Sequence, residues 1–378
     1  MPGIYIHVPF CRQACSYCDF YFVTKTDLMQ DFTDALSKEI AFWFKEDVFP
    51  IGISTIYFGG GTPSRLGKNH WIQIFEALKP FLESTTFIEI TVEVNPDDVT
   101  EDYLLFLKSL GVNRLSMGVQ TFDSNLLMFM NRAHTSEQAE NAIQIIKKCN
   151  FNSYTVDLIY GNPGQSLDEL AQDLQIFLSF DPPHISAYSL TIEPRTRLGK
   201  AFENGKLDPA EDDLVAEQMS FIQDKLEKAG YSRYEVSNYA KPGHESKHNS
   251  AYWKHETYLG FGPGAHSFFW NGKDAAQRWQ HPADLKKWIQ NPIEKTELTE
   301  LNFHDLVEER FLIGLRTKKG IEIQELENRY GFSLSVKQHN LIKSYQKNGL
   351  FEKVDSHLRL SQDGFLLADR IALELISV

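Results

Sequence analysis

Three of the four cysteines lie within eight residues, as Cys11, Cys15 and Cys18. Their C-x3-C-x2-C spacing begins just after the apolar run at residues 4–6, which reads as a strand. Thiolate is the soft ligand that iron–sulfur clusters use, and one such loop can wrap three thiolates around one face of a cubane. Three ligands for four irons would leave one iron open to a substrate. The spacing therefore favours an iron–sulfur cluster with an open iron.

Two other interpretations of the cysteines stay open at this point. A tetrahedral zinc site needs a fourth ligand, and His7 could supply it. The thiols could also be incidental buried groups, since free cysteine behaves as a small hydrophobe. Cys149 stands alone near the end of a predicted helix and is expected to be a core residue.

The elements that must position the cysteine loop alternate between strand and helix. Strands are predicted at 4–8, 54–58, 87–94, 114–119, 154–160 and 185–190, and helices at 28–46, 68–82, 100–110, 136–148, 167–180 and 209–229. Strands that alternate with helices of ten or more residues specify a parallel sheet with right-handed crossovers. The first 240 residues therefore contain six βα units.

The loops after the strands favour a partial (βα)6 barrel with its site at the carboxyl ends of the strands. A doubly wound sheet is the alternative. Its dinucleotide fingerprint is G-x-G-x-x-G before a helix, and the run Gly59-Gly60-Gly61 has no third glycine at that spacing. The expected fold class is α/β, with a smaller α+β domain at the C-terminus.

The remainder of the chain divides into two parts. Residues 241–300 are expected to form an irregular linker segment rich in glycine, histidine and aromatic residues. Residues 301–378 have the helix and hairpin order of a winged helix. Their 11 Lys or Arg balance 11 Asp or Glu, so no basic stripe marks a nucleic-acid reader. We expect a domain that packs on the barrel or covers it.

The composition of the chain argues against several classes of function. A formal charge of −13 argues against non-specific nucleic-acid binding, which needs concentrated Lys and Arg. The chain starts with a predicted strand instead of a signal peptide, and it has no run of 18 apolar residues. We therefore expect a cytoplasmic protein without a transmembrane segment.

The glycine run is a more specific signal when it is considered together with the cysteines one βα unit earlier. Glycines after a strand let backbone amides approach a ligand closely. Together the two motifs resemble the radical S-adenosylmethionine (SAM) proteins, in which such a loop after the second strand binds the amino-acid end of SAM.

Further markers at strand ends resemble one branch, the oxygen-independent coproporphyrinogen III oxidase-like family. The matching segments are residues 5–11, 59–63, 93–96, 118–122 and 157–161 together with Arg132. The resemblance spans essentially the entire chain. It implies that Cys11, Cys15 and Cys18 hold a [4Fe-4S] cluster. It also implies a SAM site lined by Tyr5, Tyr17, Gly60, Gly61, Thr62, Glu93, Gln120, Arg132 and Asp157.

The resemblance also implies roles for single residues and a type of chemistry. Glu93 can accept hydrogen bonds from ribose hydroxyls, and Arg132 can pair with the methionine carboxylate. The cluster would cleave SAM reductively to methionine and a 5′-deoxyadenosyl radical, while the protein sets distance and orientation.

Two departures separate this chain from the oxidase that names the family. That enzyme has a further cysteine where this chain has Phe20, and it carries an N-terminal extension that is not found here. Both differences argue against porphyrinogen decarboxylation.

A third feature lies at residues 248–253. The residues His248, Asn249, Tyr252 and Trp253 form an H-N-x-x-Y-W pattern that resembles the heme-binding signature of the heme chaperones within this family. Heme needs an axial ligand such as imidazole and flat aromatic walls. The alternative is a hydrogen-bonded structural histidine beside two core aromatics.

The functional hypothesis is a radical SAM heme chaperone that binds a [4Fe-4S] cluster, SAM and heme. It would transfer heme to a respiratory hemoprotein, including one at the membrane. An oxygen-independent coproporphyrinogen III oxidase and a cluster-bearing winged-helix regulator are the alternatives.

Overall fold

Six parallel strands form the centre of the molecule. The computed structural model describes residues 2–45, 53–84, 89–151, 153–272, 275–352 and 355–378. The strands are β1 (Gly3–Val8), β2 (Thr55–Gly60), β3 (Glu89–Val94), β4 (Arg114–Gln120), β5 (Ser153–Tyr160) and β6 (His184–Ser189), paired in chain order. A doubly wound sheet would reverse this order, so the open barrel is confirmed.

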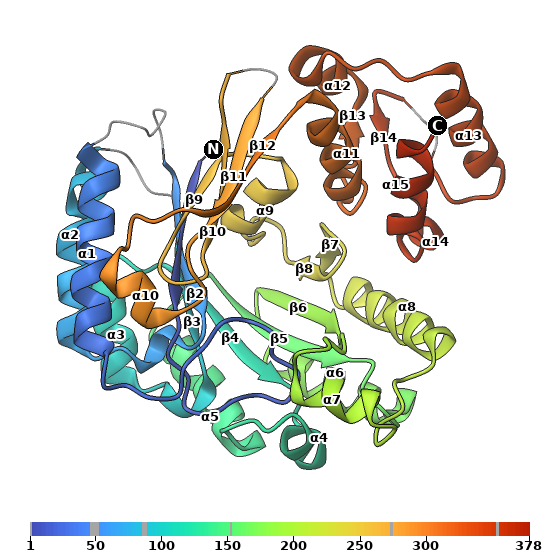
Figure 1. Ribbon diagram of the computed structural model, residues 1–378. Helices are drawn as coiled ribbons and strands as arrows, with labels where there is room; N and C mark the ends of the chain where they lie inside the picture. The colour runs from blue at the N-terminus through green and yellow to red at the C-terminus, as the bar shows by residue number, and fades with distance from the viewer. Residues whose placement is uncertain (1, 46–52, 85–88, 152, 273–274, 353–354) are drawn as a thin grey trace.

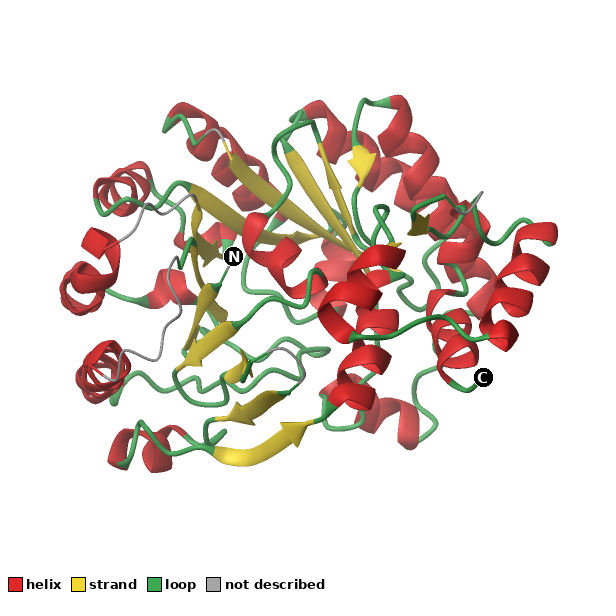
Figure 2. Ribbon diagram, turned by 90° about the horizontal axis from the view of Figure 1, so that it is seen from above, coloured by secondary structure: helices red, strands yellow, loops and turns green. Residues whose placement is uncertain are grey.

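The crossover helices cover the outer side of this curved sheet (Figure 2). They are α1 (Met29–Lys45), α2 (Lys68–Ser84), α3 (Glu101–Ser109), α5 (Ser136–Lys148), α6 (Leu167–Ser179) and α8 (Asp212–Lys228). Capping boxes at Thr135 and Ser166 begin α5 and α6, because each side chain accepts from the third helical amide. Two short helices were not expected, α4 (Ser124–Phe129) and α7 (Arg197–Glu203).

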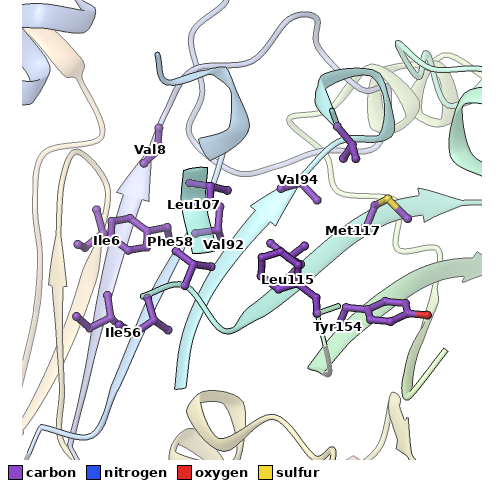
Figure 3. Packing of buried hydrophobic residues seen from close by; sticks show 14 of the residues in the cluster. Ile6, Val8, Ile56, Phe58, Val92, Val94, Leu107, Leu115, Met117 and Tyr154 are labelled. Carbon is purple, nitrogen blue, oxygen red and sulfur yellow. The ribbon is translucent and has the colours of Figure 1, made fainter. Parts of the chain in front are cut away.

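Each strand presents an apolar outer face and a polar inner face. Ile6 pairs in register with Phe58, and Phe58 with Val92, and all three are fully buried toward the helices. Figure 3 shows this row with its continuation through Leu115 and Tyr154. The intervening residues point into the barrel, because side chains alternate along a strand. The polar lumen is therefore a direct consequence of the strand pattern.

Residues 241–300 are not an irregular linker, and this expectation was wrong. They form α9 (Lys247–Trp253), β9 (Tyr258–Phe261), β10 (His266–Trp270), β11 (Ala276–Gln280), α10 (Leu285–Gln290) and β12 (Thr296–Leu301). Strand β9 pairs parallel with β1, and β10 to β12 extend the sheet as antiparallel strands. These strands are four to six residues long, and glycines interrupt the chain between β9, β10 and β11, so the sequence shows no clear alternation. At the other edge, β7 (Ser232–Arg233) and β8 (Asn238–Ala240) follow β6.

The C-terminal residues form a second apolar cluster, which also includes Phe268 of β10 and Ala276 of β11. The helices are α11 (Phe303–Gly314), α12 (Ile323–Tyr330), α13 (Val336–Lys347), α14 (Gln362–Phe365) and α15 (Ala368–Ile376), beside the short pair β13 (Ile321–Glu322) and β14 (His357–Leu358). The expected hairpin includes residues 353–354, which lie outside the described residues, and its ends meet as a bridge between Phe351 and Leu360. The sequence pattern predicts one helix over 364–375, and the structure divides this stretch into α14 and α15.

This C-terminal unit packs on α9 (Figure 1). Arg310 donates to the carbonyl of Trp253 at 3.2 Å, and Arg329 donates to the carbonyl of His255 at 2.8 Å. These contacts support the expected packing role, while the domain boundaries at 240 and 300 stay a prediction. Within the described residues no helix is long and apolar enough to cross a membrane.

The alternating pattern predicts a large cost for removing an outward-facing aromatic side chain. Phe58 is fully buried with its ring 4.9 Å from that of Trp71. Phe58→Ala should lower the free energy of unfolding by about 3–5 kcal/mol, measured by urea denaturation, because it leaves a cavity between sheet and helix. Phe202→Ala, at an exposed position in α7, is the control and should change it by less than about 0.5 kcal/mol. Equal losses in the two variants would contradict this account.

Candidate cluster and cofactor site

The cysteine loop leaves β1 at Val8 and returns to it at Val23. Cys11 N–H donates to the carbonyl of Val23 at 2.9 Å, and Val23 N–H donates to the carbonyl of Pro9 at 2.8 Å. The middle of the loop is tied to α4, since the backbone N–H and the hydroxyl of Ser16 donate to the carbonyls of Met130 and Phe129. The loop is thus fixed at its ends and at its centre.

All three thiols line one cavity of about 640 Å³ inside the barrel. Burial raises the pKa of Cys11 to about 12 and that of Cys18 to about 11. Such thiols stay protonated until a cation favours the thiolate, and the irons of a cluster provide that charge. The donor set therefore fits a three-thiolate cluster.

The zinc alternative loses its fourth ligand in this structure. The ring nitrogens of His7 are both engaged, one with the Tyr21 carbonyl at 2.8 Å and one with the Tyr5 hydroxyl at 3.1 Å. Among the described residues, no three His, Cys, Asp or Glu side chains converge as ligands of one metal ion.

Arg132 connects the cluster loop to the end of β4. Its guanidinium donates to Asn95 Oδ1 at 2.9 Å and to the Gly118 carbonyl at 2.6 Å, and it lies 3.3 Å from Cys15 Sγ. Its Nε is buried without a hydrogen-bond partner. An orphaned donor on a cation at the cavity wall fits a carboxylate ligand such as the methionine end of SAM.

The glycine run after β2 forms a close-packed wall of the same cavity. Gly60 has φ +102°, in the region that favours glycine. A Cβ on Gly61 would lie 2.7 Å from the Val8 carbonyl oxygen, so the loop packs directly on the cysteine strand. Thr62 donates to Cys11 Sγ at 3.7 Å. The glycines bring this loop up to the thiols.

Two carboxyl groups face the lumen with raised pKa values. Burial raises the pKa of Glu93 to about 7 and that of Asp157 to about 6. Glu93 accepts from the Tyr57 hydroxyl at 2.8 Å and from Gly60 N–H at 3.2 Å. A cationic ligand such as SAM would favour the ionised forms of both carboxyl groups.

Gln120 ends β4 with φ +72°, which is uncommon for a residue with a side chain. A Cβ on the neighbouring Gly118 would lie 2.7 Å from Gln120 Nε2, so this glycine leaves room for the glutamine. Backbone strain of this kind gathers at functional sites.

Eight of the nine expected SAM-site residues line the barrel cavity: Tyr17, Gly60, Gly61, Thr62, Glu93, Gln120, Arg132 and Asp157. Tyr5 lines a neighbouring groove instead. Sequence reasoning gave no role to several other residues of the cavity wall, which are Tyr57, Asn95, Arg114, Ser116, His184 and Ser186. All but Asn95 are inward-facing strand positions, and their alternation with apolar residues is the signal that could have found them.

The H-N-x-x-Y-W segment forms α9 between the barrel and the C-terminal unit. His248 is 1% exposed, and its ring nitrogens contact the Thr55 hydroxyl at 2.9 Å and the Tyr252 hydroxyl at 2.8 Å. Asn249 lines the barrel cavity and Tyr252 the neighbouring groove, whereas Trp253 lines neither. Ligation of heme by His248 therefore stays a prediction, and it requires one of these hydrogen bonds to break.

Comparison with known proteins agrees with this geometry. Residues 5–176 match the Radical SAM superfamily, and residues 301–367 match the HemN C-terminal domain. The solved structure of coproporphyrinogen III oxidase (HemN) from Escherichia coli superposes with a TM-score of 0.82 at 22% identity, covering 100% of this chain and 90% of that one. The fold and site together define a radical SAM protein, a class that uses SAM and a [4Fe-4S] cluster.

Relatives in sequence identify the branch of the radical SAM proteins. The heme chaperone HemW of Bacillus subtilis is 33% identical over 98% of both chains. The HemW proteins of Lactococcus lactis and Haemophilus influenzae are 34% and 32% identical, over 97% and 99% of this chain and 95% and 97% of theirs. The chain belongs to the HemW family of heme chaperones.

Three thiols on one loop predict all-or-none loading of the cluster. Anaerobically reconstituted protein should hold about four irons, and Cys15→Ala should lose the cluster together with SAM cleavage. The matched control is Cys149→Ala, a buried cysteine outside the cavity. Iron and sulfide analysis with electron paramagnetic resonance checks both variants. Full iron content in Cys15→Ala would contradict the assignment.

The buried Glu93 predicts a pH-dependent stability in the SAM-free protein. Its folded-state pKa of about 7 lies above the ordinary value, so the folded protein holds a proton that the unfolded chain releases. Stability should therefore fall as pH rises from about 5 to 8.

Glu93→Gln should remove this part of the fall, so the difference in melting temperature between variant and wild type should grow across that range. Glu203→Gln, at an exposed site, is the control. If the melting temperatures of Glu93→Gln and wild type differ by the same amount at every pH, Glu93 does not titrate as expected.

Proposed function

We propose that this chain is a heme chaperone, which binds heme and transfers it to a recipient hemoprotein of the respiratory chain. The observation that carries the proposal is the likeness to chains named heme chaperone HemW across 98% of both sequences. The barrel cavity supports it, because the cavity has the donors expected for cluster and SAM next to a second groove rich in aromatic residues.

The barrel residues would bind and orient SAM. When bound, the cluster supplies an electron for reductive cleavage of SAM. Arg132 would hold the carboxylate through its unpaired Nε, and Glu93 would accept from the ribose hydroxyls. Asp157 faces the same lumen from β5 and would add negative charge opposite a cationic ligand.

Phe20 supports the chaperone over the porphyrinogen oxidase. It stands where the oxidase has a further cysteine, and its side chain is 69% exposed at the junction of barrel cavity and groove. A large exposed aromatic side chain offers a surface for a flat apolar ligand and cannot ligate iron.

Location in the cytoplasm stays a prediction.

The proposal predicts heme binding without porphyrinogen oxidation. The reconstituted protein should bind heme, while coproporphyrinogen III incubated anaerobically with SAM and a reductant should not lose carbon dioxide. Absorbance titration and chromatography of the porphyrins measure the two activities side by side. Formation of protoporphyrinogen IX would assign the oxidase activity instead.

A further inference from the structure

We propose that Tyr57 of β2 is a positioning residue that couples the SAM site to α9, so that bound SAM holds the His248 ring in its stacked position. The inference rests on the proposed chaperone function and adds a regulation of the same site. Tyr57 is half-buried and lines the barrel cavity. It contacts a carboxyl group of the SAM site with its hydroxyl and the α9 histidine with its ring.

The hydroxyl of Tyr57 orients the carboxylate that we expect to bind the ribose of SAM. Tyr57 donates to Glu93 Oε1 at 2.8 Å, and Gly60 N–H donates to Glu93 Oε2 at 3.2 Å. One donor on each oxygen fixes the plane of the carboxylate. Each oxygen can accept a second hydrogen bond, so both ribose hydroxyls still find an acceptor. Tyr57 therefore prepares Glu93 for SAM without competing with it.

The ring of Tyr57 stacks on two other rings. Its centroid lies 6.2 Å from that of Tyr5 and 5.2 Å from that of His248, with interplanar angles of 26° and 27°. Thr55 lies two residues earlier on the same face of β2, and its hydroxyl contacts His248 Nδ1 at 2.9 Å. Strand β2 thus holds the imidazole of His248 by one ring and one hydroxyl.

The backbone of α9 is anchored separately from this imidazole. The N–H groups of Lys247 and His248 donate to Glu89 of β3 at 2.9 and 2.8 Å. The second ring nitrogen of His248 contacts the hydroxyl of Tyr252, which lines the groove outside the barrel cavity, the outer groove. The imidazole can therefore leave its stack while the start of α9 stays fixed. This gives the element two states, stacked and withdrawn.

The two states differ in how well they bind SAM. In the stacked state Glu93 keeps both of its donors. When the imidazole withdraws, the Tyr57 ring loses a neighbour and its bond to Glu93 weakens. A ligand shifts an equilibrium toward the state that it binds better, so SAM favours the stacked state. The effect is reciprocal, and a ligand that takes the imidazole of His248 lowers the affinity for SAM.

The test is anaerobic equilibrium dialysis of SAM against the full-length, cluster-loaded protein without a reductant, with iron–sulfur content measured in each variant. His248→Ala and Tyr57→Phe should each raise the Kd of SAM by about fivefold or more. The double variant should bind no more weakly than Tyr57→Phe alone, because both changes act through the same bond to Glu93.

The matched control is His255→Ala. His255 is also buried, and its ring nitrogens contact the Tyr330 hydroxyl at 3.0 Å and Glu309 at 3.1 Å. It lines the outer groove instead of the barrel cavity, so this variant should bind SAM like wild type.

A pH profile separates positioning of Glu93 from a mere change in cavity shape. The hydrogen bond from Tyr57 lowers the pKa of Glu93, so its loss should raise that pKa. As pH falls, SAM binding should therefore decline at a higher pH in Tyr57→Phe than in wild type. Asp157, Tyr5 and Cys18 also face Glu93 and are the same in both proteins. A change in shape alone would weaken binding equally at every pH and would overturn the positioning role.

A second set of titrations adds heme and separates the two proposals. Heme-saturated wild type should bind SAM about fivefold or more weakly than the heme-free protein. If heme binds and the affinity for SAM is unchanged, the coupling falls while the chaperone function stands. If no heme binds, the chaperone function falls, and the SAM titrations of the variants still decide on Tyr57. Wild-type affinity in His248→Ala, or full additivity in the double variant, would overturn the coupling.

Discussion

The structure depends on one constraint, the division of each barrel strand into an apolar face and a polar face. Residues such as Ile56 and Val92 are fully buried against helices, while Tyr57 and Glu93 on the same strands point inward. Buried polar groups cost free energy unless they are hydrogen-bonded. A lumen lined this way is costly to leave dry, so it needs water or a polar cofactor. The same alternation thus stabilises the fold and prepares the site.

Local patterns were enough to predict the barrel, and the family resemblance supplied most of the expected residues of its cavity. The cysteine spacing, the glycine run and the polar residues at strand ends each follow from a short stretch of sequence. The strands of residues 258–301 could not be predicted this way, because they are short and gain stability from the pairing of β9 with β1 and of β10 to β12 in sequence beside it. The hydrogen bonding of the buried His248 could not be predicted either, since its partner Thr55 lies 193 residues away in sequence. Contacts of that kind leave no periodic signal.

The relation to the oxidase rests on shape, whereas the relation to the chaperones rests on sequence. HemN shares the fold at 22% identity, and the HemW proteins share about a third of their residues over the full chain. One departure from the oxidase pattern lies in the cysteine loop, where Phe20 stands between the barrel cavity and the outer groove. A change at one junction can alter what a barrel accepts while the cofactor wall persists, because function lies in sites carried by a fold.

The pairing of β1 with β9 also bears on how the protein is made. Gly3 pairs with Tyr258 and Ile6 with Phe261, so the first strand waits for a partner synthesised some 250 residues later. Until then, one edge of β1 is open to other chains. Chains that end before residue 258 would keep this edge exposed. The barrel cavity is lined almost entirely by residues 11–193, so the site for the cluster and the edge that needs protection are completed at different stages of synthesis.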